Sequence, residues 1–250
     1  MVSLPTPTQE ISHPLLEEKQ VRLFVKRDDL VHPEIMGNKW RKLKYNLKEM
    51  KKTMQSVLVT LGGAYSNHIA ATAAAAHEHG VKAVGIIRGD ELNENSNPTL
   101  RFAHEKGMKF DFVDRSTFRA FRNDPDFIRK TYPKHYYLPE GGTNELAIKG
   151  CEEIIREIKF PFDVIATPIG TGGTMAGLVK SAEKDQKVIG ISSLKGDFIF
   201  NEIAELLKKM KIKEENYSII NAYHFGGYGK TNADLIDFIN WFKENFHIPL

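Results

Sequence analysis

Short apolar runs alternate with longer helical segments along most of the chain. The run at residues 56–61 is almost continuously apolar and is bounded by Gly62-Gly63, which is typical of a strand buried on both faces of a sheet. The short runs lie at residues 21–25, 56–61, 81–87, 108–113, 162–167, 188–191 and 217–220. This repeated alternation predicts an α/β fold with parallel twisted sheets, helices on both faces and right-handed crossovers.

Helical patterns fill most of the intervals between these runs. They lie at residues 39–51, 98–106, 143–159, 174–184, 197–209 and 232–246, with an alanine-rich helix that ends near Gly80. We expect Ser66-Asn67 to cap the alanine-rich helix and Thr143 to cap the 143–159 helix. Residues 93–97 are the expected exposed loop.

The composition argues against several classes of protein. The 35 Lys and Arg residues are interspersed with 32 Asp and Glu residues, so no basic stripe indicates a nucleic-acid groove. No apolar stretch of about 20 residues predicts a membrane span, and the N-terminus lacks the pattern of a secretory signal. The single cysteine, Cys151, excludes an intramolecular disulfide, and we interpret it as a bystander. We therefore expect a soluble, cytoplasmic protein without a nucleic-acid or membrane partner.

The segment Gly170-Thr171-Gly172-Gly173-Thr174 joins an apolar strand to a helix. Glycines allow consecutive backbone N–H groups to face one point, and a helix N-terminus adds partial positive charge, so the segment suits a phosphate. A tight turn without a ligand is the alternative. A dinucleotide site is disfavoured because Met175 stands where the fingerprint requires its third glycine. A nucleotide P-loop is disfavoured because the segment lacks the Gly-Lys-Ser/Thr ending of that motif.

The segment Gly37-Asn38-Lys39-Trp40-Arg41-Lys42-Leu43 could carry a Schiff-base lysine. Such an amine must be neutral to attack a carbonyl, and burial or nearby cations favour the neutral form. Arg41 and Lys42 supply positive charge beside Lys39. On spacing alone, a solvated lysine explains Lys39 equally well.

Two further glycine-bearing segments stand out. Gly62-Gly63-Ala64-Tyr65-Ser66-Asn67-His68 suits an anion such as a substrate carboxylate, although a simple N-cap also explains it. Phe225-Gly226-Gly227-Tyr228-Gly229-Lys230 presents a tyrosine on open backbone, and an ordinary turn is the alternative. His77 and His79 do not share a helix face, so no metal site is expected.

Taken together and in this order, the four segments resemble the 1-aminocyclopropane-1-carboxylate deaminase / D-cysteine desulfhydrase family of fold-type II pyridoxal 5′-phosphate (PLP) enzymes. The resemblance covers essentially the whole chain. It implies a two-domain, tryptophan synthase β-like fold, with a larger domain at residues 1–43 plus 160–250 and a smaller one at 44–159. PLP would lie between them, the substrate would be a small amino acid, and the protein would be a homodimer.

The resemblance also implies roles for individual residues. Lys39 would form the Schiff base with PLP and move protons at the reacting carbons of the substrate. Ser66 would bind the substrate carboxylate, and Tyr228 would line the substrate side. The remaining cofactor contacts would come from Lys42 and Gly170, Thr171, Gly172, Gly173 and Thr174 at the phosphate, Asn67 at the phenolic oxygen, and His68 near the ring.

The implied reaction releases ammonia from a small amino acid and forms a 2-oxo acid. The family continues beyond the position of residues 246–250 into a segment with a tyrosine near the substrate and a partner for the pyridine nitrogen. A chain without that segment would be a fragment, or a PLP-binding protein with little or no catalysis. A nucleotide-binding oxidoreductase, resting only on residues 170–173, is the third hypothesis.

Overall fold

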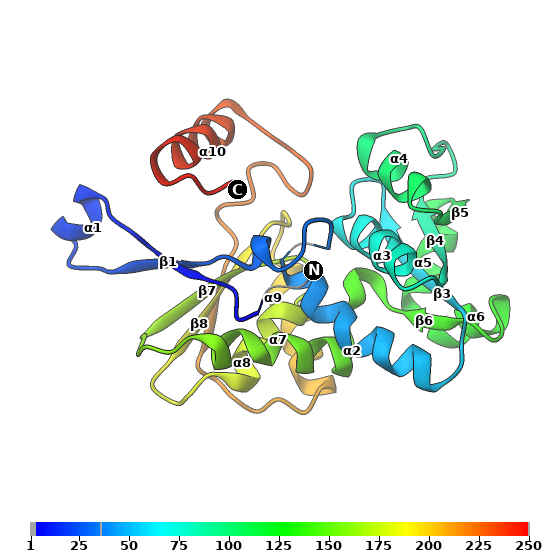
Figure 1. Cartoon of the computed structure of the whole chain (residues 1–250), viewed down its shortest axis with the longest axis horizontal. Helices are drawn as coiled ribbons and strands as arrows, with labels where there is room; N and C mark the ends of the chain where they lie inside the picture. The colour runs from blue at the N-terminus through cyan, green and yellow to red at the C-terminus, as the bar shows by residue number, and fades with distance from the viewer. Residues whose placement is uncertain (1–3, 36, 250) are drawn as a thin grey trace.

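The computed structural model describes residues 4–35 and 37–249. Residues 1–3, 36 and 250, which fall in the expected larger domain, therefore lie outside the described residues. Residues 1–3 also belong to the N-terminal segment in which no secretory signal was expected. Two parallel sheets and one antiparallel pair of strands form the frame (Figure 1). No helix within the described ranges is long and apolar enough to cross a membrane.

A four-stranded parallel sheet of order β5-β4-β3-β6 forms one half of the molecule. Its strands are β3 (Val57–Gly63), β4 (Lys82–Arg88), β5 (Lys109–Val113) and β6 (Tyr136–Leu138). One face packs on α3 (Asn67–Glu78) and α4 (Pro98–Glu105), and the other on α5 (Arg115–Asn123) and α6 (Pro125–Thr131). Because both faces are covered, the central strand β3 is buried along most of its length, as the sequence predicts.

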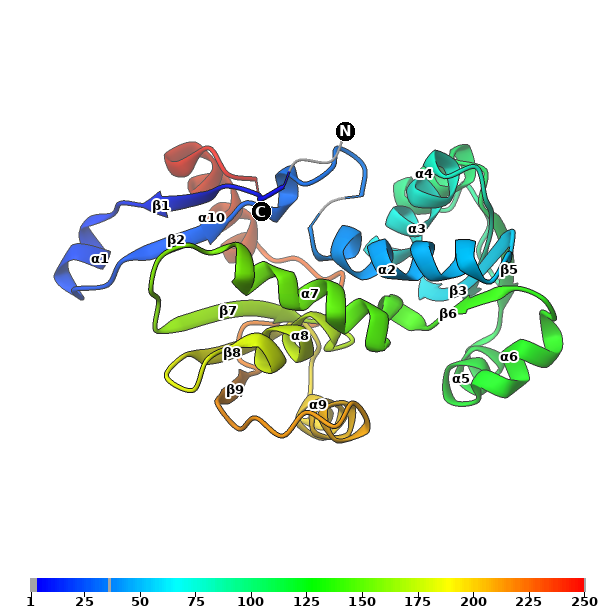
Figure 2. The same cartoon turned by 60° about the horizontal axis from the view of Figure 1, so that its bottom comes forward.

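A three-stranded parallel sheet of order β7-β8-β9 forms the second half. It consists of β7 (Val164–Ile169), β8 (Lys187–Ser192) and β9 (Tyr217–Ile220). Buried side chains of α7 (Glu145–Glu157), α8 (Gly173–Ser181) and α9 (Phe198–Lys209) share one core with this sheet. Figure 2 shows these helices beside the three strands.

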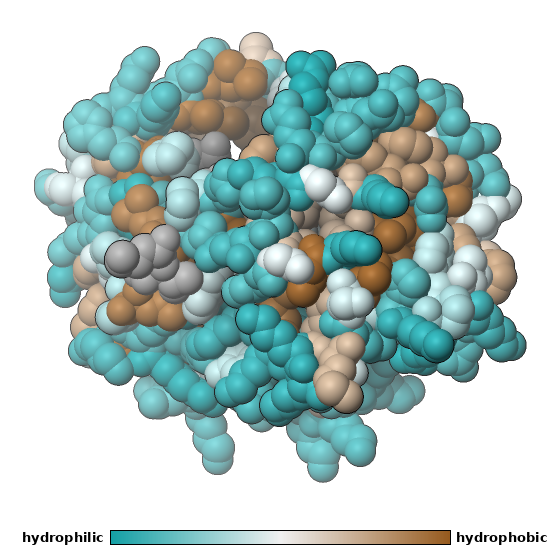
Figure 3. Space-filling view, turned by 45° about the vertical axis from the view of Figure 1, so that its right-hand side comes forward, coloured by the Kyte–Doolittle hydropathy of each residue, from teal (hydrophilic) through white to brown (hydrophobic). Residues whose placement is uncertain are grey.

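Two peripheral elements complete the chain. The antiparallel strands β1 (Thr8–Ile11) and β2 (Leu23–Lys26), with α1 (Pro14–Glu18) between them, project from the body (Figures 1 and 2). Helix α10 (Ala233–Phe246) packs against this hairpin through a small apolar cluster. Elsewhere, the face in Figure 3 is largely hydrophilic, with hydrophobic surface recessed between polar side chains.

Helix α2 (Asn38–Lys52) connects the two halves. Its apolar side contributes Leu43 and Leu47 to the core beneath α3, and its other side lies against α7. The α2–α7 approach depends on Gly150, where a Cβ would overlap the Arg41 carbonyl oxygen. At Gly177 of α8, a Cβ would lie 2.5 Å from that of Cys151. Small residues therefore allow α2, α7 and α8 to pack closely.

The expected parallel sheets and helix alternation are confirmed. One expected cap is wrong, because Asn144 and not Thr143 accepts the hydrogen bond from Ala147 N at the start of α7 (2.9 Å). The Thr143 hydroxyl instead faces Thr171. The division into two domains stays a prediction. Since α7 packs with the second sheet, we propose that the smaller domain ends near Gly142 rather than at residue 159.

Candidate active site

The first turns of α2 bring Lys39 and Lys42 to the junction of the two halves. Lys42 is buried, and its Nζ donates to the Gly141 carbonyl (3.0 Å) and to Thr143 Oγ1 (3.3 Å). Lys39 is half-buried. Burial and the positive charge of Lys42 lower the pKa of Lys39 from 10.5 to about 7. A large fraction of the amine is then neutral near neutral pH, as a nucleophilic lysine requires.

We expected Arg41, together with Lys42, to supply positive charge beside Lys39, and the structure shows how the Arg41 charge is partnered. Its guanidinium is fully buried and pairs with Asp28 (2.8 Å) and Glu157 (2.5 Å). Lys26 pairs with the same Glu157 carboxylate (2.8 Å). Two carboxylates thus compensate the Arg41 charge, and the network fixes α2 against α7. Arg41 acts on the site through the position of the helix.

The glycine-threonine turn, residues 170–174, lies beside Lys42. Gly172 is the N-cap residue of α8, with a left-handed φ of 78°. Thr171 Oγ1 lies 2.6 Å from Thr143 Oγ1, and Asn38 Nδ2 donates to Thr174 Oγ1 (2.7 Å). These bonds connect the turn to the β6–α7 loop and to the start of α2.

The space between Lys42 and this turn fits a phosphate group. A Cβ on Gly173 would lie 2.8 Å from Thr143 Oγ1 and 3.0 Å from Lys42 Nζ, so the absence of a side chain keeps the cradle open. No carboxylate within the described residues pairs with Lys39 or Lys42. A bound dianion would supply the missing countercharge, with the α8 N-terminus adding N–H donors. The residues present therefore suit the phosphate of PLP.

His68 lies beneath this junction. Thr60 Oγ1 donates to the Leu138 carbonyl (2.9 Å) and lies 2.8 Å from His68 Nε2, so Nε2 is assigned the proton and donates to the hydroxyl. Burial, Lys39 and Lys42 lower the pKa of His68 well below its usual value, which keeps the ring neutral. A Cβ on Gly142 would lie 3.0 Å from the ring. His68 thus supports the loop that carries Gly141 and Thr143, and cofactor binding by His68 stays a prediction.

The N-terminus of α3 carries the other expected site residues. Ser66 is the N-cap, and its Oγ accepts from Ile69 N (3.3 Å), which leaves its own proton free to donate. Asn67 is exposed, with no side-chain hydrogen bond among the described residues. Tyr228 is half exposed, and its hydroxyl donates to the Tyr65 carbonyl (3.2 Å). This bond brings the segment at residues 225–230 beside the segment at residues 62–68.

Sequence reasoning missed the β6–α7 loop as part of the site. Gly141 and Thr143 contact both Lys42 and Thr171. The pair Gly141-Gly142 between a strand and a helix was the available signal, since both residues adopt positive φ. Cys151 is buried in the core that α7, α8 and α9 share with the second sheet, and burial raises the pKa of its thiol.

The chain belongs to the family of pyridoxal-phosphate dependent enzymes, whose pattern it matches over residues 3–249. PLP is accordingly its cofactor, and the fold is that of fold-type II PLP enzymes. A crystal structure of an ACC deaminase homologue superposes with a TM-score of 0.85 at 26% identity, covering 100% of this chain and 80% of that one.

Three named relatives are similar to the chain over most of its length. A Thermotoga maritima protein provisionally named as a 1-aminocyclopropane-1-carboxylate deaminase is 29% identical, covering 94% of this chain and 80% of the relative. The bifunctional D-cysteine desulfhydrase/1-aminocyclopropane-1-carboxylate deaminase of Arabidopsis thaliana is 26% identical (96% and 66% covered). The D-cysteine desulfhydrase of Klebsiella pneumoniae is 25% identical (100% and 76% covered). The chain is thus similar to enzymes named for both activities.

Proposed function

We propose that this protein removes ammonia from a small amino acid, in the manner of D-cysteine desulfhydrase or 1-aminocyclopropane-1-carboxylate deaminase, and forms a 2-oxo acid. The observation that carries the proposal is the lowered pKa of Lys39, about 7, one helical turn from Lys42, whose Nζ lies beside Gly173 of the glycine-threonine turn. When bound, PLP supplies an electron sink conjugated to the substrate amine.

Lys39 is the residue that binds the cofactor aldehyde. Its Nζ is neutral often enough to attack a carbonyl, because Lys42 and burial disfavour the ammonium. Once released from the cofactor by the incoming substrate, the same amine accepts and returns a proton at the reacting carbons. A pKa near 7 allows it to act in both directions at neutral pH.

Lys42 and the turn of residues 170–174 hold the phosphate end. Lys42 Nζ is anchored by Gly141 and Thr143, so its charge is fixed toward Gly173. Buried positive charge and backbone donors bind a phosphate dianion more strongly than an exposed lysine does. A phosphate held there would keep the cofactor aldehyde within reach of Lys39.

The substrate end is expected at the N-terminus of α3. The free Ser66 proton and the N–H groups of the first turn suit a carboxylate. Asn67 would contact the cofactor's phenolic oxygen, and Tyr228 would border the substrate through its contact with Tyr65. A homodimer, which the resemblance implies, completes the proposal.

Borohydride trapping tests the assignment of Lys39. Purified protein with added PLP should be coloured, and reduction followed by peptide mass spectrometry should place the modification on Lys39. The Lys39→Ala variant should lose it. Lys48→Ala is the matched control, because Lys48 is exposed on the same helix. Modification that persists in Lys39→Ala would refute the assignment.

Product assays separate catalysis from binding alone. Incubation with D-cysteine should yield pyruvate and sulfide, and 1-aminocyclopropane-1-carboxylate should yield 2-oxobutyrate and ammonia. The half-exposed Tyr228 and exposed Asn67 leave the substrate side open, which favours the alternative of a PLP-binding protein with little catalysis. Trapping on Lys39 without either product would support that alternative.

A further inference from the structure

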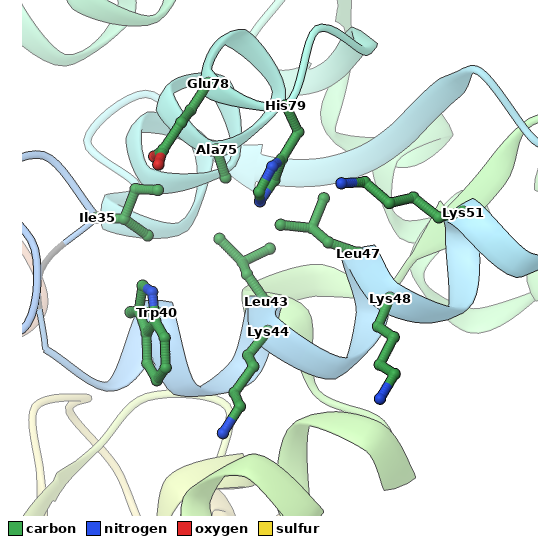
Figure 4. A pocket seen from close by; sticks show the side chains of 10 residues that line it. All are labelled: Ile35, Trp40, Leu43, Lys44, Leu47, Lys48, Lys51, Ala75, Glu78 and His79. Atoms are coloured by element: carbon green, nitrogen blue, oxygen red, sulfur yellow. The ribbon is translucent and has the colours of Figure 1, made fainter. Parts of the chain in front are cut away.

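A cavity of about 330 Å³ lies between α2 and α3, away from Lys39. Leu43 and Leu47 on α2 point toward Ala75 on α3, and Ile35 closes one end (Figure 4). Its volume lies at the small end of the range for ligand sites, about 300–1,000 Å³. The apolar lining suits a hydrocarbon body of modest size.

The two ends of this cavity carry side chains of opposite charge. Lys51 extends toward His79 at one end, whereas Lys44 and Lys48 point away from the interior (Figure 4). Glu78 lies at the opposite end, 3.0 Å from His32 Nε2. Lys44 is also paired with Glu153 (2.7 Å). The cation available to a ligand inside is therefore Lys51, beside an imidazole that can donate.

The walls of the cavity are the two helices that also build the active site. The first turns of α2 carry Lys39 and Lys42, and the N-cap of α3 is Ser66. On α2 the lining begins at Trp40, the neighbour of Lys39, and continues to Lys51, and on α3 it comes from Ala75 to His79. A ligand that contacts both helices would restrict their relative movement and so the separation of the two groups of site residues.

We propose that this cavity binds a small monocarboxylate with an apolar body, and that its occupancy increases the affinity of the protein for PLP. The apolar body packs on Leu43, Leu47 and Ala75, and the carboxylate pairs with Lys51 and accepts from His79. By linkage, PLP tightens binding of the carboxylate by the same factor.

Isothermal titration of the PLP-loaded protein with 4-phenylbutyrate tests the binding. The neutral 4-phenyl-1-butanol carries the same body, and we expect it to bind at least about fivefold more weakly because it cannot pair with Lys51. Equal affinities for the two compounds, or no saturable binding of the carboxylate, would overturn the proposal.

Two neighbouring lysines locate the site. Lys51→Met keeps the apolar stem and removes the charge, and it should weaken 4-phenylbutyrate binding by about fivefold or more. Lys52→Met is the matched control, since Lys52 is exposed and does not line the cavity. Binding that survives Lys51→Met but disappears in Ser66→Ala would place the probe in the substrate site and reject the cavity.

PLP titrations with and without the probe test the coupling. A 4-phenylbutyrate concentration near its wild-type dissociation constant should lower the apparent PLP dissociation constant in the wild type and in Lys52→Met, and lower it clearly less in Lys51→Met. Probe binding without any shift in PLP affinity would overturn the coupling and retain the site. This readout is independent of catalytic turnover.

Discussion

The lowered pKa of Lys39 predicts how the stability of the PLP-free protein depends on pH. Folding lowers this pKa from 10.5 to about 7, through burial and then through Lys42. Between these values the unfolded chain binds more protons than the folded chain, so the free energy of unfolding rises with pH. Lys39→Met removes the titrating group and should remove this part of the slope.

The size of the effect follows from the two pKa values. Between about pH 7.5 and about pH 9.5, a group with these pKa values changes the free energy of unfolding by about 2.5 kcal/mol. Solvent reaches the half-buried amine and screens part of the penalty, so this figure is an upper bound. The difference between wild type and Lys39→Met should therefore shrink by about 1–2.5 kcal/mol over this interval.

Urea titrations followed by circular dichroism measure the effect directly. Wild type, Lys39→Met and Lys48→Met are compared without PLP at the two pH values. Lys48→Met should keep the wild-type slope, because Lys48 is exposed on the same helix. Equal slopes for wild type and Lys39→Met, or a wild type that loses stability as the pH rises, would refute the assignment of a suppressed ammonium at Lys39.

Three further substitutions test the structure around the site in urea titrations. Asn144→Ala should lower the free energy of unfolding by about 1 kcal/mol, because Asn144 caps α7. Gly150→Ala should cost about 1–3 kcal/mol and weaken PLP binding, because the added Cβ overlaps the Arg41 carbonyl oxygen. Burial raises the pKa of Glu157, but hydrogen bonds from Arg41 and Lys26 outweigh it and lower the pKa to about 2. The stabilisation is therefore present above 4.5 and lost as the pH falls toward 2, and Glu157→Gln should flatten this acid dependence.

Two of these predictions have a matched control, and each of the three has an outcome that would contradict it. Asn144→Asp retains the capping oxygen and should stay near wild type, and a larger loss in Thr143→Ala would contradict the cap assignment. Lys149→Ala changes the exposed neighbour of Gly150 and should leave PLP affinity unchanged. Wild-type stability in Gly150→Ala would contradict the close approach of α2 and α7. An unchanged acid transition in Glu157→Gln would show that the network carries little of the pH dependence.

Local signals in the sequence predicted the local features of the site. Apolar runs identified the strands other than β1 and β6, and Ser66 was correctly expected to cap α3. Contacts between residues far apart in sequence could not be inferred in the same way. Thr143 faces Thr171, 28 residues away, and Arg41 pairs with Glu157, 116 residues away. The pattern around Thr143 indicated a cap, but Asn144 takes that role. The pattern around Arg41 indicated positive charge beside Lys39 and could not show the carboxylates that pair with it.

The fold itself explains why a lysine at this position is reactive. Asn38 contacts Thr174, so the N-termini of α2 and α8 face the same space, and Gly142 joins the first turn of α3 to it through His68. Each N-terminus carries partial positive charge, which favours bound anions and disfavours an ammonium. Burial at this junction and the charge of Lys42 lower the pKa of Lys39, and the same positive surroundings would favour a bound phosphate. A substitution that separates these helix ends should therefore raise the pKa of Lys39 and weaken PLP binding together.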